Sequence, residues 1–88
     1  IEVFLSPPFD RLIRRLDPPI REAVSETIAK FKNEKNHKQL KVHTLHGNLM
    51  GLHAFSIDYR HRIVFQWIGS FGKKRALLLD FGDHSVYE

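Results

Sequence analysis

The spacing of apolar residues changes once along this 88-residue chain, and that change limits the folds open to it. Up to Phe31 the apolar residues recur every three or four positions, as on one face of an α-helix. From Leu40 onward they alternate with polar residues, which is typical of β-strands with one face in water. The sequence therefore predicts a single α+β domain over residues 1–88, in which helices precede most of the strands.

Two helix-start patterns divide the N-terminal region. Ser6 and Asp17 each precede two prolines, and a small polar residue before proline is the usual beginning of a helix. The apolar spacing after them predicts helices over residues 7–16 and 18–35. Residues 1–5 are rich in β-branched and aromatic side chains, which predicts a short strand before the first helix.

The alternating region of the chain predicts four more strands, separated by turns that contain glycine, asparagine or charged residues. They cover residues 40–46, 52–59, 62–67 and 76–81. The last of them is almost continuously apolar, so we expect it inside the sheet and not at its edge.

The predicted order is β-α-α-β-β-β-β. It can pack a helical hairpin on one face of a twisted antiparallel sheet of four to five strands, and it leaves the opposite face available for function. Within residues 62–67, Ile63 and Phe65 share one side and Arg62 lies on the other. If the apolar side meets the helices, Arg62 points to the open face.

The positive charge lies mainly in the C-terminal region. Fourteen Lys and Arg residues against ten Asp and Glu residues give a net charge of +4. Residues 37–88 hold all six histidines, and their seven basic and four acidic residues contribute +3 of that charge. This balance suits an acidic partner such as nucleic acid, although solubility alone also explains it.

Four histidines (His43, His46, His53 and His61) fall within residues 40–65, which hold the first two strands predicted from residue 40 onward, most of the third and the turns between them. Lys41, Arg60 and Arg62 lie in the same stretch. A wet strand face that carries imidazoles and guanidiniums is a candidate surface for phosphate binding or phosphate chemistry. Each histidine taken singly is also explained as an ordinary half-exposed strand or turn residue.

Several classes of protein are not expected from this sequence. It has no cysteine, which excludes the usual structural zinc sites, and His43 and His46 are three apart, on opposite faces of a strand. We therefore expect no metal and no cofactor. The sequence also has no long apolar run and no charged-then-apolar leader, so we expect a soluble cytoplasmic protein with no membrane partner.

Taken as a whole, the sequence resembles the RelE/ParE toxins of bacterial type II toxin–antitoxin systems. The resemblance covers nearly the whole chain. It is carried by the helical hairpin, by residues 43–47 and 51–65 with Arg62-Ile63-Val64-Phe65, and by an ending with Gly82-Asp83-His84 and Tyr87. RelE-like members cut messenger RNA in the ribosomal A site without a metal, and ParE-like members poison DNA gyrase.

The resemblance implies a RelE-like toxin: an endoribonuclease that cleaves mRNA on the ribosome and inhibits translation. Its partners would be the ribosome, the mRNA and an acidic, partly disordered antitoxin that holds it inactive in a hetero-oligomer. Two alternatives stay open. One is a ParE-like, non-enzymatic gyrase inhibitor on the same scaffold, and the other is an inactive relative that only binds its antitoxin.

The chemistry of a metal-free RNase suggests roles for the matching residues. The 2′-OH of the RNA attacks, so the enzyme removes its proton, protonates the departing 5′-oxygen and neutralises a charged phosphorane. Arg62 suits the last role, because a guanidinium bridges two phosphate oxygens. His84 together with His46 or His43 suits proton transfer, and Tyr87 suits base stacking or a hydrogen bond to phosphate.

The general base is left open among Lys38, Lys41, His43 and His46, because the corresponding residues vary among members of the family. The other predicted RNA contacts are basic side chains near the predicted strand ends: Lys38, Lys41, Arg60, Lys73, Lys74 and Arg75. The last three form a hairpin tip, where charged residues also serve simply to keep the tip solvated.

Overall fold

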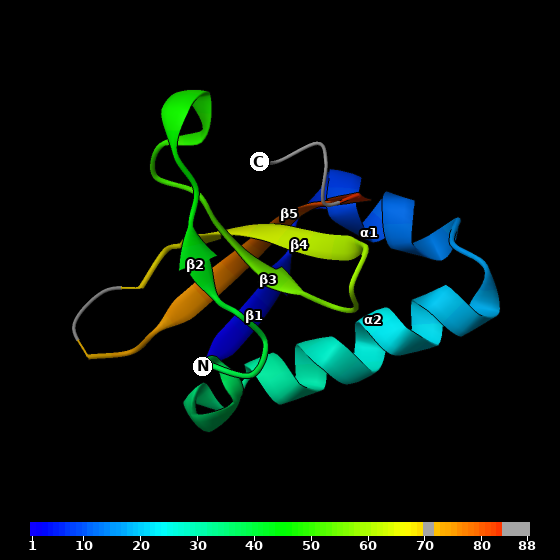
Figure 1. Cartoon of the computed structure of the whole chain (residues 1–88), viewed down its shortest axis with the longest axis horizontal. Coiled ribbons are helices and arrows are strands. Elements are labelled where there is room, and N and C mark those ends of the chain that lie inside the picture. The colour runs from blue at the N-terminus through cyan, green and yellow to red at the C-terminus, as the bar shows by residue number, and fades with distance from the viewer. Residues whose placement is uncertain (70–71, 84–88) are drawn as a thin grey trace.

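The computed structural model describes residues 1–69 and 72–83, and within these ranges a pair of α-helices lies against a five-stranded sheet (Figure 1). The predicted α+β class is confirmed. The helices are α1 (Pro7–Arg14) and α2 (Pro18–Phe31), with two 3-10 turns, η1 (Glu34–Asn36) and η2 (Gly47–Leu49). The strands are β1 (Glu2–Leu5), β2 (His43–Thr44), β3 (His53–Ser56), β4 (His61–Trp67) and β5 (Arg75–Asp83).

The strand order is β1-β5-β4-β3-β2, so β5 lies inside the sheet, as its apolar sequence predicted. Three of the four pairings are antiparallel, and β1 pairs with β5 in parallel. The sheet was predicted to be antiparallel, and the pairing of β1 with β5 departs from that prediction. A parallel neighbour needs a long connection, and here both helices and three strands intervene.

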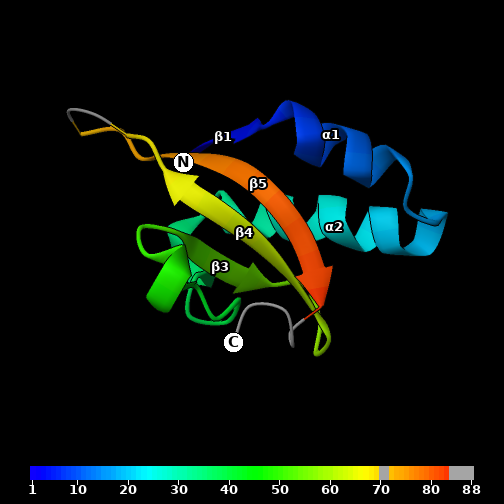
Figure 2. The same cartoon turned by 90° about the horizontal axis from the view of Figure 1, so that it is seen from above.

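The main core fills the space between the helices and one face of the sheet. Both views show α2 lying along the sheet (Figures 1 and 2). Ile63 and Phe65 of β4 are fully buried in this core, on the side that the sequence predicted. The helices supply its other large members, together with β3 and β5: Phe9, Val24, Phe31, Phe55 and Leu78.

A second, smaller apolar cluster covers some of the opposite face. Its buried members are Leu45, Ala54 and Val64, and Leu49 and Leu52 pack against them. Ala54 and Val64 are cross-strand partners whose neighbours in the chain point into the main core. The face that we expected to be open is therefore partly covered by the chain itself, around η2.

The predicted strand over residues 40–46 is reduced to His43–Thr44, because the preceding residues form turns. The N–H of Leu40 donates to the carbonyl of Asn36 (2.9 Å), and the Leu40 side chain is buried in the main core. Lys41 has a φ of 57°, which no strand residue adopts. Burial of the Leu40 side chain here outweighs the alternation of apolar and polar residues that predicted a longer strand.

Other boundaries also moved where polar side chains bind the local backbone. The helix predicted over residues 18–35 ends at Phe31, and the Asn33 side chain then accepts a hydrogen bond from the N–H of Lys35 (3.1 Å) at η1. The strand predicted over residues 52–59 ends at Ser56, before a turn closed by Asp58. By contrast, β5 continues to Asp83.

No helix in the described ranges is long and apolar enough to cross a membrane.

Candidate functional site

A hollow of about 780 Å³ lies at the end of the sheet where β3 turns into β4. Four segments form its wall: the second half of α2, residues 39–41, the β3–β4 turn with the strand ends that flank it, and Asp83 at the end of β5. We call it the turn cavity. The residues that line it include five that are used below: Lys30, Lys41, Tyr59, Arg60 and Arg62.

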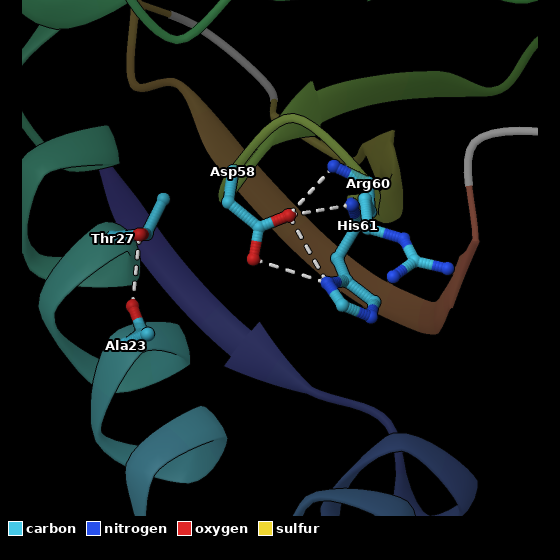
Figure 3. A network of polar contacts seen from close by, with 5 residues as sticks. All are labelled: Ala23, Thr27, Asp58, Arg60 and His61. Carbon is cyan, nitrogen blue, oxygen red and sulfur yellow. Dashed lines mark hydrogen bonds and ion pairs between the residues drawn. The ribbon is translucent and has the colours of Figure 1, made fainter.

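The β3–β4 turn is fixed by one carboxylate. One oxygen of Asp58 accepts hydrogen bonds from the backbone N–H groups of Arg60 (2.7 Å) and His61 (2.8 Å), as in an Asx turn (Figure 3). Nδ1 of His61 lies 3.0 Å from both oxygens of the same carboxylate. Burial pushes the pKa of Asp58 upward, but the hydrogen bonds from His61 and from the two N–H groups outweigh it, so this pKa lies below its usual value.

Arg62 enters the turn cavity from the start of β4. It is half-buried and lies opposite Ser56 on β3 and Gly82 on β5. Its Nε is buried and has no hydrogen-bond partner in the region of the chain that the structure describes. Arg75 also has a buried Nε without a hydrogen bond, but a carboxylate oxygen of Glu2 lies 3.6 Å away. Arg62 is thus the arginine whose donor an incoming oxygen would satisfy.

His43 lies on the same face of the sheet as Arg62. It pairs with Ala54, which pairs with Val64, and Val64 shares its face with Arg62 two positions earlier. Nδ1 of His43 lies 2.8 Å from the carbonyl oxygen of Lys41. Because a carbonyl only accepts, Nδ1 carries the hydrogen, and Nε2 is the basic nitrogen of the neutral ring.

The three other histidines of residues 40–65 differ in setting. His46 is exposed and precedes η2 without a side-chain capping bond. His53 stacks on Phe65 with ring centroids 5.5 Å apart, and His61 stacks on Phe81 at 5.3 Å besides bonding Asp58. The contacts of His53 and His61 serve packing and the turn.

The predicted RNA contacts fall into separate regions. Lys41 and Arg60 line the turn cavity with Arg62, whereas Lys38 is exposed outside its wall. Lys73, Lys74 and Arg75 lie at the other end of the β4–β5 hairpin, far from the β3–β4 turn (Figure 1).

Two of these three distant cations have partners within the fold. Nζ of Lys74 lies 3.2 Å from Glu34 and 5.7 Å from the centre of the Trp67 ring, and Arg75 faces Glu2. The structure therefore does not bring this basic tip to Arg62. His84 and Tyr87, the remaining predicted catalytic residues, lie outside the described residues.

Lys30 and Tyr59 are among the residues of the cavity wall that were not predicted as site residues. Tyr59 could have been recognised from the sequence, because an aromatic residue in a polar turn is far from the apolar residues that form the core. Lys30 could not, because only the tertiary fold places this helix residue beside the turn. Thr27, one turn earlier on α2, also reaches the wall, and its hydroxyl donates to the carbonyl of Ala23 (2.8 Å; Figure 3).

Metal-binding side chains do not gather in the described ranges. No three His, Asp or Glu residues among 1–69 and 72–83 are close enough together to hold an ion.

Comparison with family models and with curated proteins finds no match, whereas solved structures match over nearly the full chain. A YoeB/ParE toxin from Agrobacterium tumefaciens superposes with a TM-score of 0.62 at 20% identity, covering 96% of this chain and 99% of its own. This is the fold of the RelE/ParE toxins. A copper-bound mutant toxin from Helicobacter pylori matches with a TM-score of 0.58 at 19% identity, covering 98% and 97% of the two chains.

A conserved hypothetical protein from Helicobacter pylori gives a TM-score of 0.60 at 20% identity, with 97% of this chain and 96% of its own covered. The RelE/ParE fold predicted from the sequence pattern is thus confirmed. At these identities the likeness concerns the fold, and the activity has to be inferred from the residues of the site.

Proposed function

We propose that this protein is the toxin of a type II toxin–antitoxin system and cleaves mRNA on the ribosome as a metal-independent endoribonuclease. The observation that carries the proposal is Arg62, a half-buried arginine whose Nε has no partner in the described chain, at the edge of a cationic cavity. Proteins described as toxins share its fold.

Arg62 stabilises charge in the proposed reaction. Attack of the 2′-OH on the adjacent phosphorus gives a phosphorane with extra negative charge on its equatorial oxygens. A guanidinium stays protonated and donates two parallel hydrogen bonds to such oxygens, which suits Arg62 to hold them. The P–O5′ bond then breaks, leaving a 2′,3′-cyclic phosphate and a 5′-hydroxyl.

His43 accepts the proton of the attacking 2′-OH in this proposal. It shares the face of Arg62, and its bond to the Lys41 carbonyl leaves Nε2 as the basic nitrogen. His46 is the competing base from the sequence pattern. His84 protonates the 5′-oxygen, and Tyr87 contacts base or phosphate, as the resemblance suggests.

An acidic antitoxin is the proposed partner in the resting state. The net charge of +4 and the cations of the turn cavity attract a carboxylate-rich, partly disordered chain. Ordering such a chain over the cavity would cover Arg62 and block RNA.

The test is a reconstituted translation reaction with purified protein, in which primer extension reports mRNA cuts with and without ribosomes. Ribosome-dependent cuts are expected, and Arg62→Ala should reduce them about 10²-fold or more. Arg62→Lys should recover little, because an ammonium cannot bridge two oxygens. Arg21→Ala, which removes an exposed arginine outside the cavity, is the matched control.

Two further arms assign the chemistry. An mRNA with a single 2′-deoxy sugar at the cut site should stay intact, because its nucleophile is absent. Comparing His43→Ala with His46→Ala identifies the base, and we expect the larger loss, about 10²-fold, in His43→Ala. If the wild-type protein leaves the mRNA intact, the proposed nuclease function is wrong. Inhibition of gyrase supercoiling by the same protein would then establish the alternative function.

A further inference from the structure

The turn cavity has the size and construction of a ligand site. Its volume of about 780 Å³ falls within the range of small-molecule pockets, roughly 300–1,000 Å³. Its wall combines α2, residues 39–41, the β3–β4 turn and the end of β5, so these segments form a cavity only in the folded chain.

The charge in the wall favours an anionic ligand. Four cations, Lys30, Lys41, Arg60 and Arg62, face two carboxylates, Asp58 and Asp83, which leaves a net charge of +2. None of the four cations makes an ion pair within the described residues. Both carboxylates, by contrast, already have interaction partners. The cavity therefore offers unpaired donors to phosphate oxygens.

Tyr59 adds an aromatic surface at the mouth of the cavity. Its side chain is 95% exposed, the most exposed large apolar group among the described residues. The Asp58 bonds to Arg60 and His61 fix the turn that carries it. A ring held in water beside unpaired cations is suited to stacking on a nucleobase whose phosphate lies in the cavity.

The backbone conformation of Lys41 also indicates a binding site. Its φ of 57° lies in the left-handed region, where glycine is more stable than a residue with a side chain. The chain nevertheless places a lysine here, and this lysine is one of the residues that line the cavity. Strained residues of this kind cluster at binding sites.

We propose that the turn cavity binds one nucleotide of single-stranded RNA, with a phosphate between Lys41 and Arg60 and the base stacked on Tyr59. The proposal rests on the proposed function for its choice of RNA and deepens it, because the bound nucleotide is a neighbour of the one whose phosphate meets Arg62. It assigns roles to residues that the cleavage chemistry does not use.

The experiment measures binding apart from cleavage. Fluorescence anisotropy follows a labelled hexanucleotide in which 2′-O-methyl groups prevent attack, titrated with the whole protein at several salt concentrations. Tyr59→Ala should weaken binding about tenfold, as expected for loss of one stacked base, while Tyr59→Phe keeps wild-type affinity. Met50→Ala, which truncates another highly exposed apolar side chain (84%), is the matched control.

Salt dependence separates the two roles. Lys41→Ala should lower the slope of log affinity against log salt by about 0.7, the value for one single-stranded phosphate contact. Tyr59→Ala should lower affinity without changing that slope. A probe with one abasic position should abolish the difference between wild type and Tyr59→Ala when the abasic site occupies the cavity.

Each outcome decides the proposal. RNA binding that ignores both Tyr59→Ala and Lys41→Ala overturns it, and so does preferred binding of a poly-glutamate peptide with the same dependence on Lys41. If cleavage depends on Arg62 but either of these results is found, the proposed nuclease function holds and only the proposed RNA site in the turn cavity is wrong. If RNA binding depends on Tyr59 but no ribosomal cleavage occurs, the proposed nuclease function is wrong and the RNA site holds.

Discussion

Phe31 of α2 stacks on Phe55 of β3, with ring centroids 4.3 Å apart and an angle of 8° between the ring planes. A second ring, His37, stacks on Phe31 at 4.8 Å and 13°, and Nε2 of His37 lies 2.8 Å from the Phe31 carbonyl. These contacts join the end of α2, the segment after it and the sheet. They also set the position of residues 39–41, which form one wall of the turn cavity.

Replacing Phe31 by alanine should lower the free energy of unfolding by about 3–5 kcal/mol, the usual cost of deleting a fully buried ring. In so small a domain this loss can exceed the whole stability. Phe31→Leu fills most of the volume and should cost clearly less. Urea denaturation followed by circular dichroism measures both variants, and a cost for Phe31→Ala well below this range would show that the stacked rings are not a main support of the fold.

The two helix starts offer a matched pair of capping variants. Oγ of Ser6 accepts a hydrogen bond from the N–H of Phe9 (3.3 Å), whereas Asp17 makes no side-chain capping bond. Ser6→Ala should therefore cost about 1 kcal/mol of unfolding free energy, and Asp17→Ala less than about half of that. Thermal denaturation of the two variants in one buffer compares them, and a larger loss in Asp17→Ala would contradict this account.

Most of the fold was predictable because it depends on local patterns. The prolines after Ser6 and Asp17 fixed where both helices begin, and the apolar run in residues 76–81 placed β5 inside the sheet. The parallel pairing of β1 with β5 was not predictable in this way. It depends on contacts between the two ends of the chain, which no local periodicity encodes.

The candidate site was only partly predictable. Arg62 stood out because strand alternation separates it from Ile63 and Phe65. Lys30 and the left-handed Lys41 join it only through the turn after α2, where burial of Leu40 ended the alternating pattern. The basic residues 73–75 looked equally suitable in the sequence, but the hairpin carries them to the far end of the sheet.

Lys41 provides a test in which stability and binding should move in opposite directions. Lys41→Gly relieves the left-handed strain and should raise the free energy of unfolding by up to about 1 kcal/mol. Lys41→Ala keeps the strain and should not stabilise the protein. Both variants lose the ammonium group, so both should weaken RNA binding. Denaturation curves measured beside anisotropy titrations check this, and a destabilised Lys41→Gly would contradict it.

The Asp58 turn should give the protein a specific sensitivity to acid. The pKa of Asp58 in the folded chain is below its ordinary value of 3.8, so its carboxylate stabilises the fold above the unfolded pKa. That stabilisation is lost as the pH falls through the lower folded pKa. Because Asp58 is protonated only in this acidic range, the effect is separate from the ordinary titration of imidazoles.

Asp58→Asn isolates the charge, because an amide oxygen can still accept from the N–H groups of Arg60 and His61. The wild type should be more stable than Asp58→Asn at about pH 5, and the difference should shrink steadily as the pH falls to about 3 and below. Asp58→Ala loses the turn bonds as well, so it should be less stable than Asp58→Asn at every pH. Melting temperatures across this range provide the measurement. A gap between wild type and Asp58→Asn that stays constant over the whole range would show that the charge of Asp58 does not stabilise the turn that presents Tyr59 and Arg60.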